Sequence, residues 1–227
     1  MARACFQYSA TSNGEAYFFS GSRYARIKVI PSSSDDKIIY GPTKFASEWS
    51  TLVKTGFESI DAVLPAPGPG NEKDFYFFSG TRYARIRFTP GTPDESIIFG
   101  PAKITDHWVC LAKAAVDRVD AVMPIAGTSE AYFFRGENYV RVNLSDDSIV
   151  FGPAKIVDHW PSLVKSGFDV VDAILPIPDP GYEGQAYFFR GDQYSRIKVV
   201  PGSKSDEITF GPALIAKEWK SLASWDW

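Results

Sequence analysis

The sequence has few residues of the kinds that build metal centres and active sites. Among its 227 residues are two cysteines, Cys5 and Cys110, and two histidines, His107 and His159. The cysteines form no CxxC pair, and the four residues lack the spacings of a disulfide framework or of a zinc site. The sequence has no HExxH motif, and two histidines supply little general-base chemistry. We therefore expect a protein that is not an enzyme.

The chain also lacks a strong excess of charge and long apolar runs. Its net charge is −3, which argues against binding along a nucleic-acid backbone, because such binding needs a basic surface. No apolar run is long enough to span a membrane, and the N-terminus has no basic segment followed by an apolar run. We therefore expect no signal peptide, no nucleic-acid or membrane partner, and a cytoplasmic location with reduced cysteines.

What the sequence does contain is a fourfold repeat. The phrase "FGPAKITDHW" begins at Phe99 and returns as "FGPAKIVDHW" at Phe151, and looser copies begin at Tyr40 and Phe210. Each copy keeps a glycine and, eight positions later, a tryptophan. These pairs are Gly41 and Trp49, Gly100 and Trp108, Gly152 and Trp160, and Gly211 and Trp219. Because self-similarity at a regular period is typical of solenoids and propellers, the repeat decides the fold class.

Two further phrases precede each copy in a fixed order. The frame Y-F-F-x-G-x-x-Y-x-R occurs four times, starting at Tyr17, Tyr76, Tyr132 and Tyr187. The shorter phrases "DAVLP", "DAVMP" and "DAILP" begin at Asp61, Asp120 and Asp172, and "RACF" at Arg3 fills the fourth slot. Aromatic residues make up 15% of the chain, so much of this aromatic mass must be buried.

Each repeat predicts four short strands and a helix. The inner strand ends at a proline, a glycine turn joins the next two strands, and the fourth strand ends at the glycine of "GP". The proline then occupies the first helical turn, and Ile104, Trp108 and Leu111 form one apolar stripe at helical spacing. This pattern predicts an all-β, four-bladed β-propeller with a short outer helix on each blade. We expect one domain with blades at 1–57, 58–116, 117–168 and 169–227.

Together the three phrases resemble the hemopexin-like repeat, over nearly the whole chain. Among hemopexin-fold proteins, the chain looks most similar to the legume seed albumin-2 group, whose members are lone four-bladed chains poor in cysteine. The resemblance implies a non-enzymatic protein of the seed cytosol. It also implies an ion in the central channel and a small ligand, either a polyamine such as spermine or heme.

The channel is the predicted site. Four inner strands that converge on one axis leave room only for small side chains, and their main-chain carbonyls form an oxygen cage suited to calcium or sodium. The resemblance places the cation on the carbonyls of Arg3, Asp61, Asp120 and Asp172. It places a second layer, where an anion such as chloride or a second ion can bind, at Cys5, Val63, Val122 and Ile174. Arg3 departs from the acidic pattern. An alternative role for the aspartates is to cap backbone N–H groups.

The remaining repeated residues are interpreted as structural. The histidines stand where the first and fourth copies have glutamates, which indicates a polar surface position and leaves heme without an axial ligand. The arginines of the Y-x-R pairs are expected to tie each blade to its neighbour. They are Arg26, Arg85, Arg141 and Arg196. The apolar tail with Trp225 and Trp227 is expected to pack on the first blade.

Two other functions and one oligomeric state stay open from the sequence alone. The protein can be a seed storage or defence protein, although two Cys and two Met argue against a sulfur reserve. It can be a lectin-like hemagglutinin, which needs exposed aromatic side chains. It can also act as a homodimer, since a propeller face is large enough for an interface.

Overall fold

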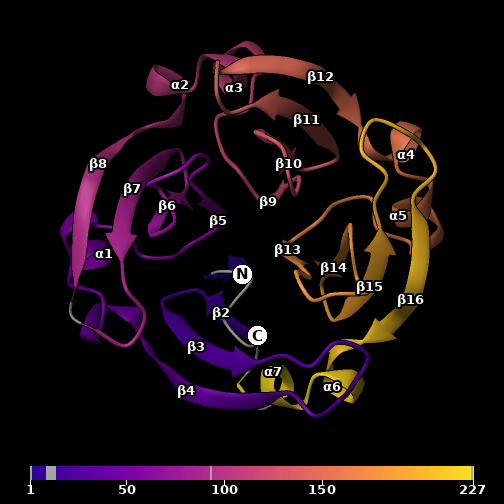
Figure 1. The fold of residues 1–227 in the computed structure, drawn as a ribbon, viewed down its shortest axis with the longest axis horizontal. Coiled ribbons are helices and arrows are strands. Elements are labelled where there is room, and N and C mark those ends of the chain that lie inside the picture. Colours follow the sequence, from indigo (N-terminus) through magenta and orange to yellow (C-terminus); the bar gives the residue numbers. More distant parts are fainter. Residues whose placement is uncertain (1, 9–13, 93, 226) are drawn as a thin grey trace.

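Four sheets stand around a central axis and form a closed ring (Figure 1). The computed structural model describes residues 2–8, 14–92, 94–225 and 227. Each sheet has four antiparallel strands in chain order, with the first strand at the axis and the fourth at the rim. The predicted four-bladed all-β propeller is therefore confirmed.

The strands divide evenly among the blades. The first blade contains β1 (Arg3–Gln7), β2 (Glu15–Ser20), β3 (Arg23–Lys28) and β4 (Lys37–Lys44). The second contains β5 (Ala62–Pro65), β6 (Asp74–Ser79), β7 (Arg82–Phe88) and β8 (Glu95–Lys103). The third contains β9 (Ala121–Pro124), β10 (Glu130–Arg135), β11 (Asn138–Asn143) and β12 (Ser148–Lys155). The fourth contains β13 (Ala173–Pro176), β14 (Gln185–Arg190), β15 (Gln193–Lys198) and β16 (Glu207–Leu214).

The Gly-Pro pair does not end the outer strand, as the sequence had indicated. In the second blade, β8 continues past Gly100 and Pro101, and Tyr83 still pairs with Ala102. Gly100 has a φ of 84°, and a Cβ there would lie 2.8 Å from the carbonyl oxygen of Tyr83. The glycine therefore permits a bulge that absorbs the Gly-Pro step within the strand. The prediction that the proline starts the helix was wrong, and the helix begins at Ile104.

The outer helix of each blade is two short pieces rather than one. The pieces are η1 (Phe45–Ser47) and α1 (Ser50–Thr55), α2 (Ile104–His107) and α3 (Val109–Lys113), α4 (Ile156–His159) and α5 (Pro161–Lys165), and α6 (Ile215–Glu218) and α7 (Lys220–Ala223). A tryptophan separates the two pieces; Trp108, for example, has φ −108° and ψ 86°, outside the helical region. The apolar stripe is still kept, because Ile104, Trp108 and Leu111 are all buried.

An acidic side chain from the next blade explains this break. The Asp147 carboxylate of the third blade accepts a hydrogen bond from the N–H of Val109, at 2.7 Å. The other three junctions have the same hydrogen bond. There the N–H groups of Thr51, Ser162 and Ser221 donate to the carboxylates of Glu95, Asp206 and Asp36, respectively. The second helical piece thus receives its N-terminal cap from a neighbouring blade. All four acids stand five residues before the glycine of the Gly-Pro pair.

The hydrophobic core lies between the blades. Each of four clusters of buried side chains takes residues from two adjacent sheets. Trp49 of the first blade, for example, packs its ring 4.7 Å from that of Phe88 in the second blade. Each sheet buries its aromatic faces only against its neighbours, so the ring is stable only when it is closed.

The C-terminal tryptophan closes the ring between the last blade and the first. The Trp227 ring lies 4.8 Å from that of Phe189 in the fourth blade and 5.2 Å from that of Phe18 in the first. Its indole N–H donates to the carbonyl of Phe19 at 2.7 Å. The expectation that the tail packs on the first blade is confirmed.

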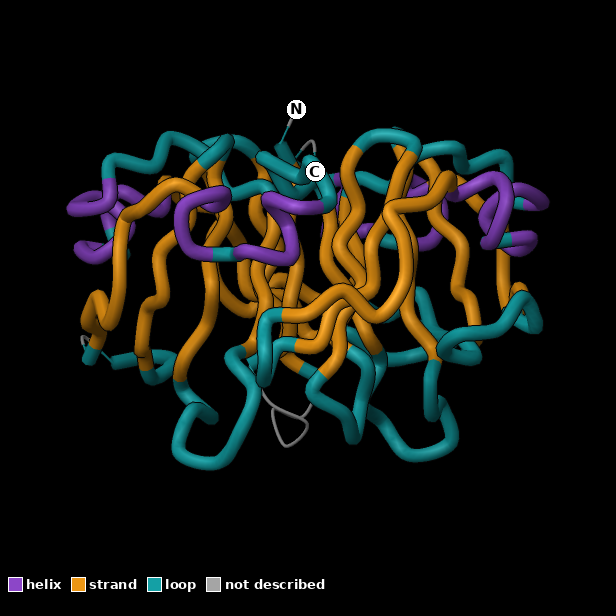
Figure 2. Tube along the Cα trace, turned by 90° about the horizontal axis from the view of Figure 1, so that it is seen from above, coloured by secondary structure: helices purple, strands orange, loops and turns teal. Residues whose placement is uncertain are grey.

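The two ends of the ring differ. The helices and both labelled termini lie toward one end, and long loops extend from the other (Figure 2). None of the helices in the described part of the chain is long and apolar enough to cross a membrane.

Asp36→Ala tests the caps between blades. Removing the carboxylate leaves the buried N–H of Ser221 without an acceptor, so we expect the free energy of unfolding to fall by about 1–2 kcal/mol. Denaturant unfolding measures the change. Asp35→Ala is the matched control, because Asp35 is exposed and bonds only within its own turn, and its effect is expected to stay within about 0.5 kcal/mol. Equal effects of the two substitutions would contradict this account.

Candidate functional site

The inner strands β1, β5, β9 and β13 line an axial channel, each in contact with the next around the ring. The residues predicted to hold a cation come directly before or at the start of these strands: Arg3, Asp61, Asp120 and Asp172. This end of the channel is the one that carries the helices and the chain termini. It is called the narrow end below.

The three aspartates at the narrow end bond in the same way. Each carboxylate accepts a hydrogen bond from the N–H of the turn glycine in its own blade, at 2.6, 2.7 and 2.6 Å. The pairs are Asp61 with Gly80, Asp120 with Gly136, and Asp172 with Gly191. The alternative role that the sequence left open, the capping of backbone groups, is therefore confirmed. The cation on the main-chain carbonyls stays a prediction.

The three carboxylates also share one electrostatic environment. Burial raises the pKa of Asp61, and the nearby charge of Asp120 raises it further, while the hydrogen bond from Gly80 opposes the shift. Arg135 partly balances Asp120 at 3.3 Å. Arg118 near Asp61 and Arg190, 3.9 Å from Asp172, also bring positive charge here, so the narrow end carries charges of both signs.

Arg3 takes a different role in the first blade. Its guanidinium donates to the carbonyl of Gly191 in the fourth blade and lies 5.2 Å from the centre of the Trp227 ring. The turn glycine Gly21 therefore donates to the carbonyl of Ala2, at 3.0 Å, instead of to a carboxylate. Arg3 helps to close the ring, and its positive charge weakens the cation site on that side.

An apolar cavity of about 520 Å³ occupies the rest of the channel. The predicted second layer lines it, so the structure brings Cys5, Val63, Val122 and Ile174 together. The prolines that end the inner strands, Pro65, Pro124 and Pro176, line its outer part. Among the described residues around it are three polar side chains that the sequence did not single out, Gln7, Glu183 and Gln185, and the thioether of Met123.

Two of these polar groups can receive a donor. The Oε1 atom of Gln7 is buried and has no hydrogen-bond partner among the described residues. The hydrogen bond from Gly181 lowers the pKa of Glu183, so this exposed carboxylate is negative. The cavity therefore combines an apolar body with acceptors, and suits an elongated molecule that carries a donor group.

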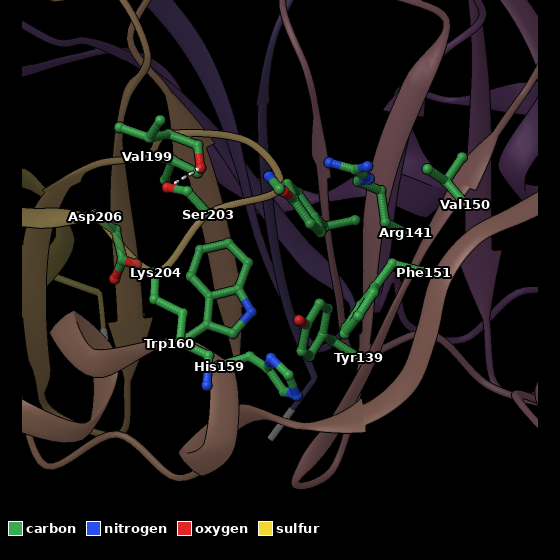
Figure 3. A pocket seen from close by; sticks show the side chains of 13 residues that line it. Tyr139, Arg141, Val150, Phe151, His159, Trp160, Val199, Ser203, Lys204 and Asp206 are labelled. Carbon is green, nitrogen blue, oxygen red and sulfur yellow. Dashed lines mark hydrogen bonds between the residues drawn. The ribbon is translucent and has the colours of Figure 1, made fainter.

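Smaller pockets lie at the rim, between adjacent blades. Figure 3 shows the pocket between the third and fourth blades, where the rings of Tyr139, Phe151 and Trp160 stand near Ser203 and Asp206 of the next blade. Its volume is about 210 Å³. Similar pockets of about 360 and 220 Å³ lie between the first and second blades and between the fourth and first.

The histidines belong to this rim. His159 lines the pocket in Figure 3 and packs its ring 5.0 Å from that of Phe151; His107 packs 4.8 Å from Phe99 in the second blade. Neither lies among the residues that line the channel. The structural interpretation of the histidines agrees with these contacts, and the channel offers no imidazole ligand to heme in the described residues.

The repeated arginines were expected to tie adjacent blades, and most bond within their own blade. Arg85 bonds to the fully buried Asp74 at 2.6 Å, because the pleat places the two side chains on one face of the sheet. Arg26 and Arg141 likewise pair with acids of their own blades, Glu15 and Glu130. Arg196 does hydrogen-bond to a neighbouring blade, through the hydroxyl of Ser32, and the Arg141 guanidinium lies against Gly202 of the fourth blade.

Comparisons with known proteins place this architecture. The cow pea hemopexin fold protein CP4 is 28% identical to the chain with a TM-score of 0.86, over 98% of this chain and 96% of that one. The chain is thus a four-bladed propeller of the hemopexin fold. It is 30% identical to albumin-2 from Lathyrus sativus over 95% of the chain and 93% of that protein, and 29% identical to albumin-2 from Pisum sativum over 95% and 92%. The chain belongs to the albumin-2 family.

Two solved structures from Cicer arietinum are similar to the same extent. One is a plant albumin described as showing hemagglutination, with 27% identity, a TM-score of 0.86 and coverage of 98% and 96%. The other is a plant lectin described as having two metal binding sites, with 28% identity, a TM-score of 0.86 and the same coverage. A scan against models of protein families found no match.

The reaction rate of the Cys5 thiol measures how accessible the second layer of the channel is to a reagent in solution. Cys5 and Cys110 are free and buried, and burial raises the pKa of Cys5 well above its ordinary value. Because the thiolate is the reactive form, we expect both thiols to react with an aromatic disulfide reagent at least about a hundredfold more slowly in the native than in the unfolded chain. Absorbance after mixing gives the rates, and Cys110→Ser isolates Cys5. Fast native labelling of Cys5 would show that the second layer is open.

Proposed function

We propose that the protein is a non-enzymatic binding protein that holds a metal ion at the narrow end of its channel and a small ligand in the cavity beyond. The observation that supports this proposal is the axial cavity, which the inner strands line with apolar side chains, together with Asp61, Asp120 and Asp172 directly before those strands. Seed cytosol is the proposed location, by analogy with the family.

Main-chain oxygens are the proposed ligands of the ion. The described residues contain no group of three or more His, Cys, Asp or Glu side chains that could hold a metal. The carboxylates of Asp61, Asp120 and Asp172 are engaged by glycine N–H groups, so they contribute charge more than coordination. A hard cation that is coordinated by carbonyl oxygens fits this arrangement, and calcium is the proposed ion. Sodium and chloride are proposed as further ions in the channel. The similar lectin with two metal binding sites supports this proposal.

The cavity supports a polyamine better than heme. The methylene segments of spermine match the apolar wall of Val63, Val122 and Ile174, and an ammonium group can reach Glu183 or Gln7 near the strand ends. The carboxylates of the narrow end supply further negative charge. Heme lacks an imidazole ligand in this cavity, so a heme site would have to use the outer surface or an interface between two chains.

A lectin-like hemagglutinin is the second candidate function. It is favoured by the hemagglutination described for the similar chickpea albumin and by the exposed aromatic side chains at the rim. Cross-linking of cells needs two or more sites per particle, which a homodimer or several sites on one chain would supply. A storage or defence role needs no site, and no contact in the structure favours it.

Calcium is expected to stabilise the folded chain. A ligand that binds only the native state at a concentration one hundred times its dissociation constant adds about 2.7 kcal/mol to the free energy of unfolding. We expect calcium, and separately spermine, to raise the melting temperature of metal-free protein in differential scanning calorimetry. An unchanged melting temperature with millimolar calcium would overturn the channel ion.

Asp61→Asn tests whether the negative charge at the narrow end contributes to calcium binding, because it keeps the hydrogen bond to Gly80. Asparagine keeps an oxygen that can accept from Gly80 but removes the negative charge, so we expect calcium to bind about tenfold more weakly, or about 1.4 kcal/mol, with little loss of stability. Titration calorimetry measures the affinity. Asp94→Asn removes a charge from an exposed rim position and serves as the control. Equal affinities of the two variants would show that the ion binds elsewhere.

A further inference from the structure

Three blade junctions carry a rim pocket built from the same parts. The pockets lie between blades one and two, three and four, and four and one, and are called rim pockets below. Each contains two tyrosines and an arginine of one blade, the tryptophan between its helical pieces, an aromatic residue of its outer strand and a loop of the next blade. The same residues recur in the three pockets because the sequence repeats.

The loop from the next blade forms one wall of each rim pocket. The walls include residues from 29–36, from 88–92 and from 199–206, and each of these loops contains a proline: Pro31, Pro90 and Pro201. At the remaining junction, the third blade supplies only residues 144–147, without a proline. The arginine of this junction, Arg85, is held by Asp74 and Asn71, much as Arg196 between blades four and one is held by Ser32 and Thr209.

Each rim pocket leaves one buried polar atom without a hydrogen bond. These atoms are Nε of Arg26, Nε of Arg141 and Oδ1 of Asp36, one for each pocket, with no hydrogen-bond partner among the described residues. The Nε of Arg141 does lie 3.3 Å from the Glu130 carboxylate, but not in hydrogen-bonding geometry. A buried polar group without a partner costs about 1–3 kcal/mol, so a water or a ligand hydroxyl that reaches such an atom stabilises the protein.

An exposed aromatic ring also lines each rim pocket. Tyr40, Phe151 and Phe210 are 39%, 41% and 42% exposed at the three rim pockets. Each ring rests on the tyrosine of the neighbouring strand, with centroids 6.0, 5.9 and 5.8 Å apart, so its position is fixed. A pyranose ring needs both features, because it presents a face of C–H groups to an aromatic ring and a border of hydroxyls to charged side chains.

The size of the rim pockets agrees with one sugar ring. Their volumes, between about 210 and 360 Å³, lie below or at the lower end of the range of about 300–1,000 Å³ that holds drug-sized molecules. The axial cavity, by contrast, is larger and apolar. A compact molecule rich in hydroxyl groups fits the rim pockets better than it fits the channel.

We propose that the three rim pockets are saccharide-binding sites, each for one pyranose unit, which make a single chain trivalent. This inference rests on the second candidate function, the lectin-like one. Three sites at three different junctions of the ring can cross-link cells without any dimer.

Alanine substitutions of the exposed rings test the assignment. The variants are Tyr40→Ala, Phe151→Ala, Phe210→Ala and their combination. The matched control is Phe99→Ala, because Phe99 is 40% exposed and stacks 5.7 Å from Tyr83 at the junction without the long loop. The probes are the methyl glycosides of galactose, mannose, glucose and N-acetylglucosamine, read by saturation-transfer NMR and titration calorimetry at millimolar concentration, and rabbit erythrocytes for agglutination.

The expected result is three sites per wild-type chain for at least one glycoside. Each single variant removes one site or weakens it about tenfold, the combined variant neither binds nor agglutinates, and Phe99→Ala keeps all three sites. Melting temperatures of the single variants are expected to match that of Phe99→Ala, which separates loss of binding from loss of folding.

Two results would overturn the proposal. If the combined variant agglutinates cells and binds a glycoside as Phe99→Ala does, the lectin-like function holds but its sites lie elsewhere. If the wild-type chain binds none of the glycosides and agglutinates no cells, the saccharide assignment and the lectin-like function both fail. Stabilisation by calcium tests the channel site independently of either result.

Discussion

The structure depends on aromatic packing between neighbouring blades. No sheet in the described chain has a hydrophobic core of its own, since each buried cluster contains side chains from two sheets. The ring is therefore cooperative, and it closes at the junction between the last blade and the first. There Trp227 fills the space between Phe18 and Phe189, and Arg3 reaches across to the fourth blade.

The same constraint creates the places where ligands can bind. Four twisted sheets cannot fill the axis or the outer corners, so a channel remains in the middle and pockets remain at the rim. The repeat gives the channel four equivalent carbonyl positions and gives the rim equivalent arginine and tyrosine positions. The differences between blades then set the function. Arg3 makes the narrow end asymmetric, and the short loop of the third blade leaves one junction unlike the other three.

Most of the fold could be predicted from the repeat, because phrases in fixed order fix both the number of blades and the strand order. The course of the outer strand after the Gly-Pro pair could not be predicted. The bulge there depends on a close approach between Gly100 and the carbonyl of Tyr83 on the neighbouring strand. The break at each tryptophan depends on an acid of another blade, such as Asp147 at Val109. A signal for it was present, in the acid that stands five residues before each glycine.

The candidate site could be predicted in part. The second layer around Val63 and Val122 follows from the register of equivalent inner strands, and the structure brings it to one cavity. Glu183 and the rim pockets could not be foreseen, because they come from loops that differ between blades and from contacts across junctions, and Gln7 stands at the end of β1, where the other inner strands end in proline. The arginines were misjudged for a related reason. The strand register places Arg85 beside Asp74 within one sheet, and periodicity alone does not show which face a long side chain follows.

The most direct test of the account is a crystal structure of the protein grown with calcium, with an anomalous difference map of the channel. The account predicts one strong peak at the narrow end, surrounded by the main-chain oxygens of Arg3, Asp61, Asp120 and Asp172 at the distances of about 2.3–2.6 Å that are typical of calcium. A channel without an anomalous peak, or a calcium ion bound by surface carboxylates instead, would contradict it.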